Sequence, residues 1–169
     1  LYYHWHPEVE LFFITSGRAN FQVEGEEFAI EGGDGLLVKP KALHGSHDCF
    51  GTDLEFRAVV FDYSFLSGIG NDRIEQEYLR PLLLGEGKRY LLISGKGKEQ
   101  EELFRLLNRI YLLFEKKEKG YEILLRAFLL QVVYLMLQLR TDQMRVPRTG
   151  TRKSRVIRQI VEYVEANYG

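Results

Sequence analysis

The residues best suited to chemistry lie close to the start of the chain. His4, His6 and Glu10 form the pattern His-x-His-x3-Glu, and His44 follows some way downstream. Three imidazoles and one carboxylate suit a tetrahedral or octahedral Zn, Mn, Fe or Ni site with open positions. Positions 4, 6 and 10 share strand parity, so one extended strand carrying all three would point them to the same face. The pattern therefore predicts a polar cluster that can hold a divalent metal.

Short strands are expected to position these residues. The segments 10–15 and 19–23, the region of Phe28 and Ile30, and the segments 36–38 and 55–61 are apolar or alternate at the strand period. Glu24-Gly25 is a two-residue hairpin signal. In the last of these strands Phe56, Ala58 and Val60 share one face. Short strands separated by turns at this spacing predict a barrel or a sandwich.

The pattern then changes to helices. A short helix interrupted by Pro81 is expected over 71–84, followed by a strand over 90–93. Residues 98–117 carry the apolar stripe of an amphipathic helix, and Gly120 ends it. The next helix, 121–140, is apolar nearly all round and must be covered on several sides. Its cover is the barrel alone or the barrel together with a second subunit, and the sequence leaves both open.

Charged residues are unevenly distributed along the chain. The net charge is −1, but residues 1–63 hold 4 basic and 11 acidic residues (−7), and residues 140–169 hold 7 basic and 3 acidic (+4). Such asymmetry indicates modules with different partners. Cys49 is the only cysteine, which excludes an intramolecular disulfide framework. The longest apolar stretch, 128–137, is interrupted by Gln131 and too short for a bilayer. A cytoplasmic protein without a membrane partner is expected.

Four segments are predicted in total. A barrel covers 1–95, a helical segment 96–140, a linker with Pro147 and Gly150 covers 141–152, and a further helix 153–169. A single helix does not make a helix-turn-helix reader, so no DNA-binding residue is expected in this chain.

These motifs resemble those of a broad group of proteins and, within it, those of one narrower family. His4-x-His6-x3-Glu10-x6-Gly17 is similar to the first cupin motif, and Gly33-Asp34 with Pro40 and His44 is similar to the second. The segment Lys39-Pro40-Lys41 departs from it, with lysines where cupins usually have Pro and Gly. The segments 10–17, 23–28 and 33–44 together resemble the barrel of AraC-type transcription regulators. The helices over 98–140 resemble that family's dimerisation helices, and 155–168 the first helix of its DNA-binding domain.

The resemblance implies an α+β fold, a cupin-like (jelly-roll) barrel followed by a helical dimerisation segment. It also implies a small-molecule effector in the barrel, a homodimer, and DNA contact only through a domain beyond this chain. His4, His6, Glu10 and His44 are then ligand-binding or metal candidates, because the family often keeps the pattern without a metal. Trp5, Phe12, Ile14 and Phe21 are candidate pocket-lining residues, although core packing is the favoured role for each one taken alone.

Two functions compete at this point. The first is the ligand-sensing and dimerisation part of an AraC-type regulator, without catalytic residues or a required cofactor. The second is a metal-dependent cupin enzyme, an oxygenase or isomerase, with a metal on His4, His6, Glu10 and His44. A third reading is structural, in which Glu10 and the histidines only satisfy one another's hydrogen bonds. The helices and the basic linker after the barrel favour the regulator.

Overall fold

The computed structural model describes residues 3–49, 54–68, 72–93 and 97–143. Its strands are β1 (Val9–Ser16), β2 (Arg18–Val23), β3 (Glu26–Glu31), β4 (Gly35–Val38), β5 (His44–Cys49), β6 (Glu55–Phe61) and β7 (Tyr90–Ile93). Its helices are η1 (Tyr63–Phe65), η2 (Glu75–Leu79), α1 (Arg80–Leu83), α2 (Lys98–Lys116) and α3 (Tyr121–Gln143).

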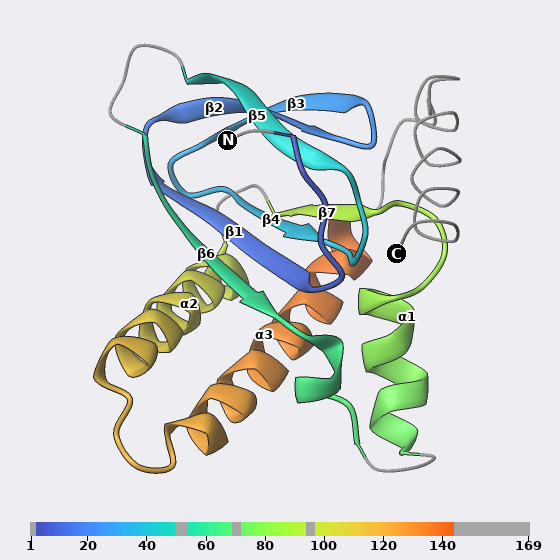
Figure 1. Cartoon of the computed structure of the whole chain (residues 1–169), viewed down its shortest axis with the longest axis vertical. Coiled ribbons are helices and arrows are strands. Elements are labelled where there is room, and N and C mark those ends of the chain that lie inside the picture. Colours follow the sequence, from blue (N-terminus) through green and yellow to red (C-terminus); the bar gives the residue numbers. More distant parts are fainter. Residues whose placement is uncertain (1–2, 50–53, 69–71, 94–96, 144–169) are drawn as a thin grey trace, which may run out of the picture.

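The strands form two antiparallel sheets that face each other. One sheet has the order β6-β1-β4-β7 and the other the order β3-β2-β5. Helices α2 and α3 cover the outer face of the four-stranded sheet, as Figure 1 shows. The fold is α+β, a cupin-like β-sandwich followed by two long helices. This confirms the predicted class, and it confirms the short strands expected over the first sixty residues.

Strand β1 contributes side chains to two hydrophobic cores. The inner core lies between the two sheets, and the outer core lies between the four-stranded sheet and the helices. Phe12 and Ile14 point to the inside of the sandwich, where they pack with Phe21 of β2. Leu11 and Phe13 point the other way and pack against the helices. A strand buried on both faces needs an almost continuous apolar run, which is what this segment has.

The turn between β2 and β3 has the backbone conformation that its sequence predicts. Glu24 and Gly25 both have positive φ (51° and 81°), which is the backbone that a two-residue type I′ hairpin needs. The hairpin between β2 and β3 is thereby confirmed. Strand β5 was not predicted, because its sequence His-Gly-Ser-His-Asp-Cys lacks apolar alternation. It forms because β2 pairs with it, with Phe21 opposite Ser46.

The helices differ from the predictions mainly at their ends. Helix α2 begins and ends close to the predicted bounds, and four residues of its apolar stripe are buried, namely Leu103, Leu106, Leu107 and Ile110. Pro81 follows the π-helix η2 directly, and Leu79 and Arg80 before it keep a helical backbone, so the helical segment continues through Pro81 and changes from π to α geometry there instead of ending. Helix α3 continues to Gln143, past its predicted end. The rest of the predicted linker and the helix over 153–169 lie outside the described residues.

The apolar part of α3 extends beyond 128–137, the stretch that was predicted to be too short to span a bilayer. Over Tyr121–Leu139 it is long and apolar enough to cross a membrane by length and composition, and 28% of this stretch is buried. One side, including Leu129, Val132 and Met136, packs into the outer core with β1 and α2. That packing makes α3 a core helix of this domain, and it leaves the opposite side exposed.

The β3–β7 edge of the sandwich is closed by a compact cluster. The rings of Phe28 and Tyr90 stack at 4.8 Å. Glu26 accepts hydrogen bonds from the Tyr90 hydroxyl (2.7 Å) and the Lys88 ammonium (2.9 Å). The ion pair and the stack together join the two sheets at this edge.

Tyr90→Phe is expected to lower the free energy of unfolding by about 1 kcal/mol, because it removes one hydrogen bond to a carboxylate and keeps the ring stack. Urea unfolding monitored by circular dichroism measures the change. Tyr78→Phe is the control, since Tyr78 is 44% exposed and should give no change. Equal effects of the two variants would contradict a stabilising role for the Tyr90 hydroxyl.

Candidate functional site

The four sequence-predicted polar residues meet at one end of the sandwich, but by a different route from the one expected. His4 and His6 do not lie on one strand with Glu10, because β1 begins only at Val9. Pro7 separates the histidines from the strand, and it has no N–H to give to a ladder. His4 instead forms an antiparallel bridge with His44, with both backbone N–H···O distances at 3.0 Å. The prediction of a shared strand was therefore wrong, and the prediction of a cluster was right.

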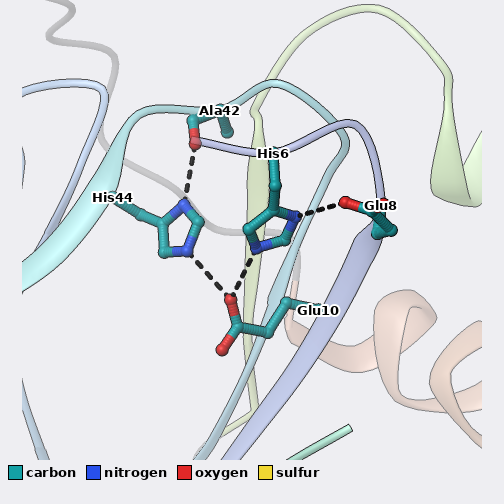
Figure 2. A network of polar contacts seen from close by, with 5 residues as sticks. All are labelled: His6, Glu8, Glu10, Ala42 and His44. Atoms are coloured by element: carbon teal, nitrogen blue, oxygen red, sulfur yellow. Dashed lines mark hydrogen bonds and ion pairs between the residues drawn. The ribbon is translucent and has the colours of Figure 1, made fainter. Parts of the chain in front are cut away.

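The cluster is tight enough for its members to share one ligand. One donor atom from each of His4, His6, Glu10 and His44 lies within 4.8 Å of the others. Figure 2 shows Glu10 Oε2 in contact with His6 Nε2 at 3.1 Å and with His44 Nε2 at 2.9 Å. Both contacts end on the same oxygen, and Oε1 points away from the imidazoles. Glu10 and His44 are buried, and His4 is exposed.

A backbone carbonyl fixes the orientation of His44. Its Nδ1 lies 2.7 Å from the Ala42 carbonyl oxygen, so Nδ1 carries the proton and donates it there. Nε2 is left to face Glu10 or a ligand. A carbonyl on the far nitrogen is also the partner that metal-binding histidines commonly have.

The turn before β5 delivers His44 despite its lysines. Lys41 has a left-handed backbone (φ 61°), a conformation that glycine adopts at least cost, and its N–H bonds the His6 carbonyl at 2.7 Å. The buried Lys39 extends its ammonium to the Gly85 carbonyl at 2.8 Å. Backbone hydrogen bonds therefore hold the turn against the N-terminal segment.

Electrostatics couple Glu10 to His44. Burial alone would raise the pKa of Glu10, but hydrogen bonds from His44 and His6 outweigh it and hold the pKa below its usual value. Burial alone would lower the pKa of His44, but its bonds to Glu10 and to the Ala42 carbonyl outweigh it and raise the pKa. Each group thus stabilises the charged form of the other.

This coupling predicts a stability difference with a maximum in mildly acidic solution. A raised folded-state pKa makes the His44 contribution complete below 6.5 and lost as the pH rises through the folded pKa. A lowered folded-state pKa makes the Glu10 contribution complete above 4.5 and lost as the pH falls through the folded pKa. The free energy of unfolding of the wild type minus that of Glu10→Gln should therefore be largest between pH 4.5 and 6.5.

Urea unfolding of both proteins from pH 4 to pH 8, with EDTA present, measures this difference. Its maximum is expected at about 1.5–3 kcal/mol, the size of a hydrogen bond to a charged group. A difference that stays constant across the whole range would show that the two groups are not coupled.

The predicted pocket-lining residues lie in two different settings. Phe12, Ile14 and Phe21 are buried in the inner core, where the rings of Phe12 and Phe21 are 4.6 Å apart. Trp5 lies on the segment before β1 and is exposed. Core packing is thus a role that the three buried residues visibly have.

Sequence reasoning missed an open cleft at the edge of the four-stranded sheet. The cleft has a volume of about 480 Å³ and is lined from both sides of β6, by Thr15, Leu54, Glu55, Phe56, Arg57, Ala58 and Tyr111. The alternation of β6 was recognised, but its exposure depends on how the second sheet packs. Arg57 lies on the helix side, where it donates a hydrogen bond to Asn108 and sits 4.3 Å from the Tyr111 ring centre.

Comparison with known proteins places this site in a family context. The family model described as the AraC-like ligand binding domain matches residues 2–133, most of the chain. The chain belongs to this family. The family consists of transcription regulators and not of enzymes, which contradicts the metal-dependent enzyme weighed above.

Individual proteins are similar to this chain in sequence or in structure, at low sequence identity. The HTH-type transcriptional regulator YdeC of Bacillus subtilis is 22% identical over 165 residues, which cover 98% of this chain and 55% of YdeC. The AraC-like transcriptional activator CuxR has a TM-score of 0.53 and 13% identity, covering 96% of this chain and 53% of CuxR. An apo ToxT variant from Vibrio cholerae has a TM-score of 0.51 and 12% identity, covering 96% of this chain and 58% of ToxT. The chain spans about half the length of these relatives.

Proposed function

We propose that this chain is the effector-sensing and dimerisation part of a cytoplasmic AraC-type regulator, with a small-molecule effector bound inside the barrel. The observation that carries the proposal is the cluster of Glu10, His6 and His44 at the end of an otherwise apolar interior. A few converging polar groups in an apolar cavity are typical of small-molecule sites. DNA contact is assigned to a domain beyond this chain.

A thermal-shift screen of sugars, aromatic acids and other metabolites tests the effector site. An effector that binds only the folded chain raises its melting temperature in proportion to its concentration and affinity. Glu10→Gln should abolish the shift given by a true effector. Glu26→Gln is the matched control, because Glu26 also faces inward and accepts two hydrogen bonds, but at the closed edge. An effector whose shift is equally reduced in both variants, or in neither, would contradict a site at Glu10.

The same four residues fit a divalent metal, and this is the second candidate role. The donor set of three imidazole nitrogens and one carboxylate oxygen suits Zn, Ni, Mn or Fe, and the Ala42 carbonyl orients His44 Nε2 toward the shared space. A metal held there would offer its open positions to the polar groups of the effector. His4, the exposed member, would be the ligand nearest to solvent.

Elemental analysis separates the two roles. The chain is expressed in medium supplemented with Zn, Ni, Mn and Fe, and the metal content of the wild type and of Glu10→Ala is measured. Stoichiometric metal that disappears in the variant assigns the quartet to a metal. A wild type without metal assigns it to direct effector contact.

Strand β6 contacts the interior of the barrel with one face and helix α2 with the other. Phe56 and Ala58 lie on its inner side, and Arg57 between them is tied to α2 through Asn108 and Tyr111. An effector that displaces β6 would therefore act on α2. Signalling requires that the effector prefer one arrangement of these elements over the other.

Dimerisation is proposed through the exposed sides of α2 and α3. Large apolar side chains are exposed near the turn between the two helices, namely Leu112, Phe114, Ile123 and Leu124. An apolar surface of this kind is typical of an interface with another protein chain. A second copy of this chain is the partner that we propose.

A further inference from the structure

Strand β6 is an uncovered edge of the four-stranded sheet. Among the described strands it pairs with β1 alone, so its other side offers backbone N–H and C=O groups to a further strand. Its inner side is also uncovered, because four strands lie over three. Phe56 is 40% and Val60 52% exposed, whereas Ile14, which pairs with Phe56, is fully buried. An edge strand without proline or lysine, as this one is, is suited to pair with another chain.

The cleft beside β6 lies where a further strand would lie. Four consecutive residues of β6, Glu55 to Ala58, line it, and successive residues of a strand point to opposite sides of the sheet. A space of about 480 Å³ that touches both sides must therefore follow the edge of the strand. An extended chain fits such a space, because it forms main-chain hydrogen bonds to the edge and places alternate side chains on the two sides.

Helix α2 continues beyond this edge and would lie under an added strand. Its contacts with the sheet move from β1 to β6: the Phe104 ring centre is 5.8 Å from that of Phe13, and the Tyr111 ring centre, two turns later, is 4.3 Å from the Arg57 guanidinium carbon. The helix ends at Lys116, about 7.5 Å further in the same direction. A further strand would lie about 5 Å from β6, so the last turn of α2 would pack against it.

The sequence around β6 is complementary to itself in one antiparallel register. Pairing centred on Phe56 places Glu55 opposite the partner's Arg57, and Arg57 opposite the partner's Glu55. It thus makes two opposite-charge pairs on the helix side and one aromatic pair on the inner side, and both kinds of pair stabilise neighbouring strands. Centring on Arg57 would place two guanidinium groups opposite each other, and centring on Ala58 would place the charges opposite apolar residues. The segment that lines the cleft, 54–58, is also centred on Phe56.

The helices favour the same centre. Helix α2 crosses the sheet at the level of Arg57, which pairs with Phe13 of β1, and it contacts both residues. A two-fold axis at Phe56 lies one residue toward the start of β6, so it places the partner's α2 beside α2 on that side. An axis at Ala58 would place it on the other side, toward the end of β6. Helix α3 already lies there, because its Arg126 donates hydrogen bonds to backbone carbonyls just after η1.

The side of α2 that faces away from α3 carries an exposed leucine. Leu112 is two residues from the buried Ile110, so it points to nearly the opposite side of the helix, and it is 56% exposed. With the axis at Phe56, the partner's α2 would cover it. Leu112 also belongs to the α2–α3 surface proposed for the dimer, so the edge of β6 and that surface are continuous.

We propose that two copies of this chain pair through the free edges of β6, antiparallel and centred on Phe56, so that their four-stranded sheets become one continuous sheet. This β6 pair rests on the dimer of the proposed function, because it names the strand that joins the two copies. Each Phe56 ring then lies opposite its own copy on the inner side of the sheet, and each covers part of the surface that the other exposes.

Single cysteines test the register, in a Cys49→Ser background that leaves no other thiol. Phe56→Cys should form a disulfide-linked dimer in oxidised glutathione, because directly opposed residues of antiparallel strands have Cα atoms about 4.5–5.5 Å apart, within the range of a disulfide. Ala58→Cys is the matched control, since its two copies would be about 14 Å apart and should stay unlinked. Non-reducing gel electrophoresis measures both. Linkage through Ala58→Cys instead of Phe56→Cys, or equally through both, would overturn the proposed register.

A second variant keeps the test independent of the Phe56 ring. The double variant Leu54→Cys/Ala58→Cys, in the same background, places each new thiol opposite the other residue's copy. It should form disulfide-linked dimers, whereas neither single variant should. Equal linkage of the double and the single variants would contradict the β6 pair.

Charge reversal tests the same pairing without a cross-link. Each opposite-charge pair occurs twice in the dimer, so Glu55→Arg or Arg57→Glu alone should raise the dimer dissociation constant about tenfold. The double variant Glu55→Arg/Arg57→Glu should return it to within about threefold of the wild type, which a mere loss of the Arg57 contact with α2 would not do. Glu31→Arg is the control, because Glu31 is an exposed glutamate on β3, another edge strand, and it should change nothing. Analytical ultracentrifugation measures all four, and a double variant no tighter than the singles would overturn the pairing of Glu55 with Arg57.

The failure of the β6 pair and that of the proposed dimer are distinguishable. A wild type that stays monomeric would remove the dimer and the β6 pair with it. A dimer that dissociates in Leu124→Glu, but neither links through Phe56→Cys nor responds to charge reversal, would overturn the β6 pair and leave the α2–α3 surface standing. A dimer that survives Leu124→Glu and still needs Glu55 and Arg57 would support the β6 pair and remove Leu124 from the interface.

Discussion

Replacing Phe13 with alanine is expected to lower the free energy of unfolding by about 3–5 kcal/mol, the usual cost of truncating a fully buried phenylalanine. Phe13 is completely buried on the helix side of β1, and its ring meets that of Phe104 on α2 at 5.8 Å. The alanine would leave a cavity between the sandwich and the helices. Because both layers are rigid elements, neither can collapse far enough to fill it.

Urea unfolding monitored by circular dichroism measures the loss, with an unchanged denaturant slope as evidence that the folded state stays compact. Tyr78→Ala is the control, because Tyr78 is a large but exposed aromatic residue whose truncation should change stability by at most about 0.5 kcal/mol. A loss below about 1 kcal/mol for Phe13→Ala would mean that the helices are not held through this residue.

The strands were predictable where local patterns decide them. The apolar run of β1, the alternation of β2 and β6 and the Glu24-Gly25 turn each encode their own conformation, and each is found. Strand β5 carries no such pattern. It is a strand because β2 supplies a partner, and a contact between distant segments cannot be read from its own residues.

The candidate site was predictable in its members and not in its geometry. The types and spacing of His4, His6, Glu10 and His44 identified the cluster. His4 and His6 do not share a strand with Glu10 as predicted. Pro7 interrupts strand pairing before β1, and the N-terminal segment pairs with β5 instead. The exposure of Phe56 could not be predicted from the sequence either, since it depends on the number of strands in the facing sheet.

The structure also changes the meaning of the apolar helix. The sequence required cover on several sides of α3, and the sandwich supplies it on one side only. The uncovered side repeats along the helix at Leu124, Ala127, Gln131 and Tyr134, spacings of three and four residues that put all four on one face. Leu124 is the most apolar of these four, and the exposed Ile123 lies beside it, next to the turn from α2. This is the surface for which the proposed dimer accounts.

Leu124→Glu is therefore expected to raise the dimer dissociation constant by at least about 100-fold, because it would bury an unpaired carboxylate at the centre of an apolar interface. Analytical ultracentrifugation over a range of concentrations measures the constant. Ile74→Glu is the matched control, since Ile74 is 54% exposed, close to the 50% of Leu124, but lies directly before η2 and not on α2 or α3. This variant should dimerise like the wild type. A wild type that remains monomeric at the highest concentration, or equal effects of the two variants, would contradict the assignment of the α2–α3 surface.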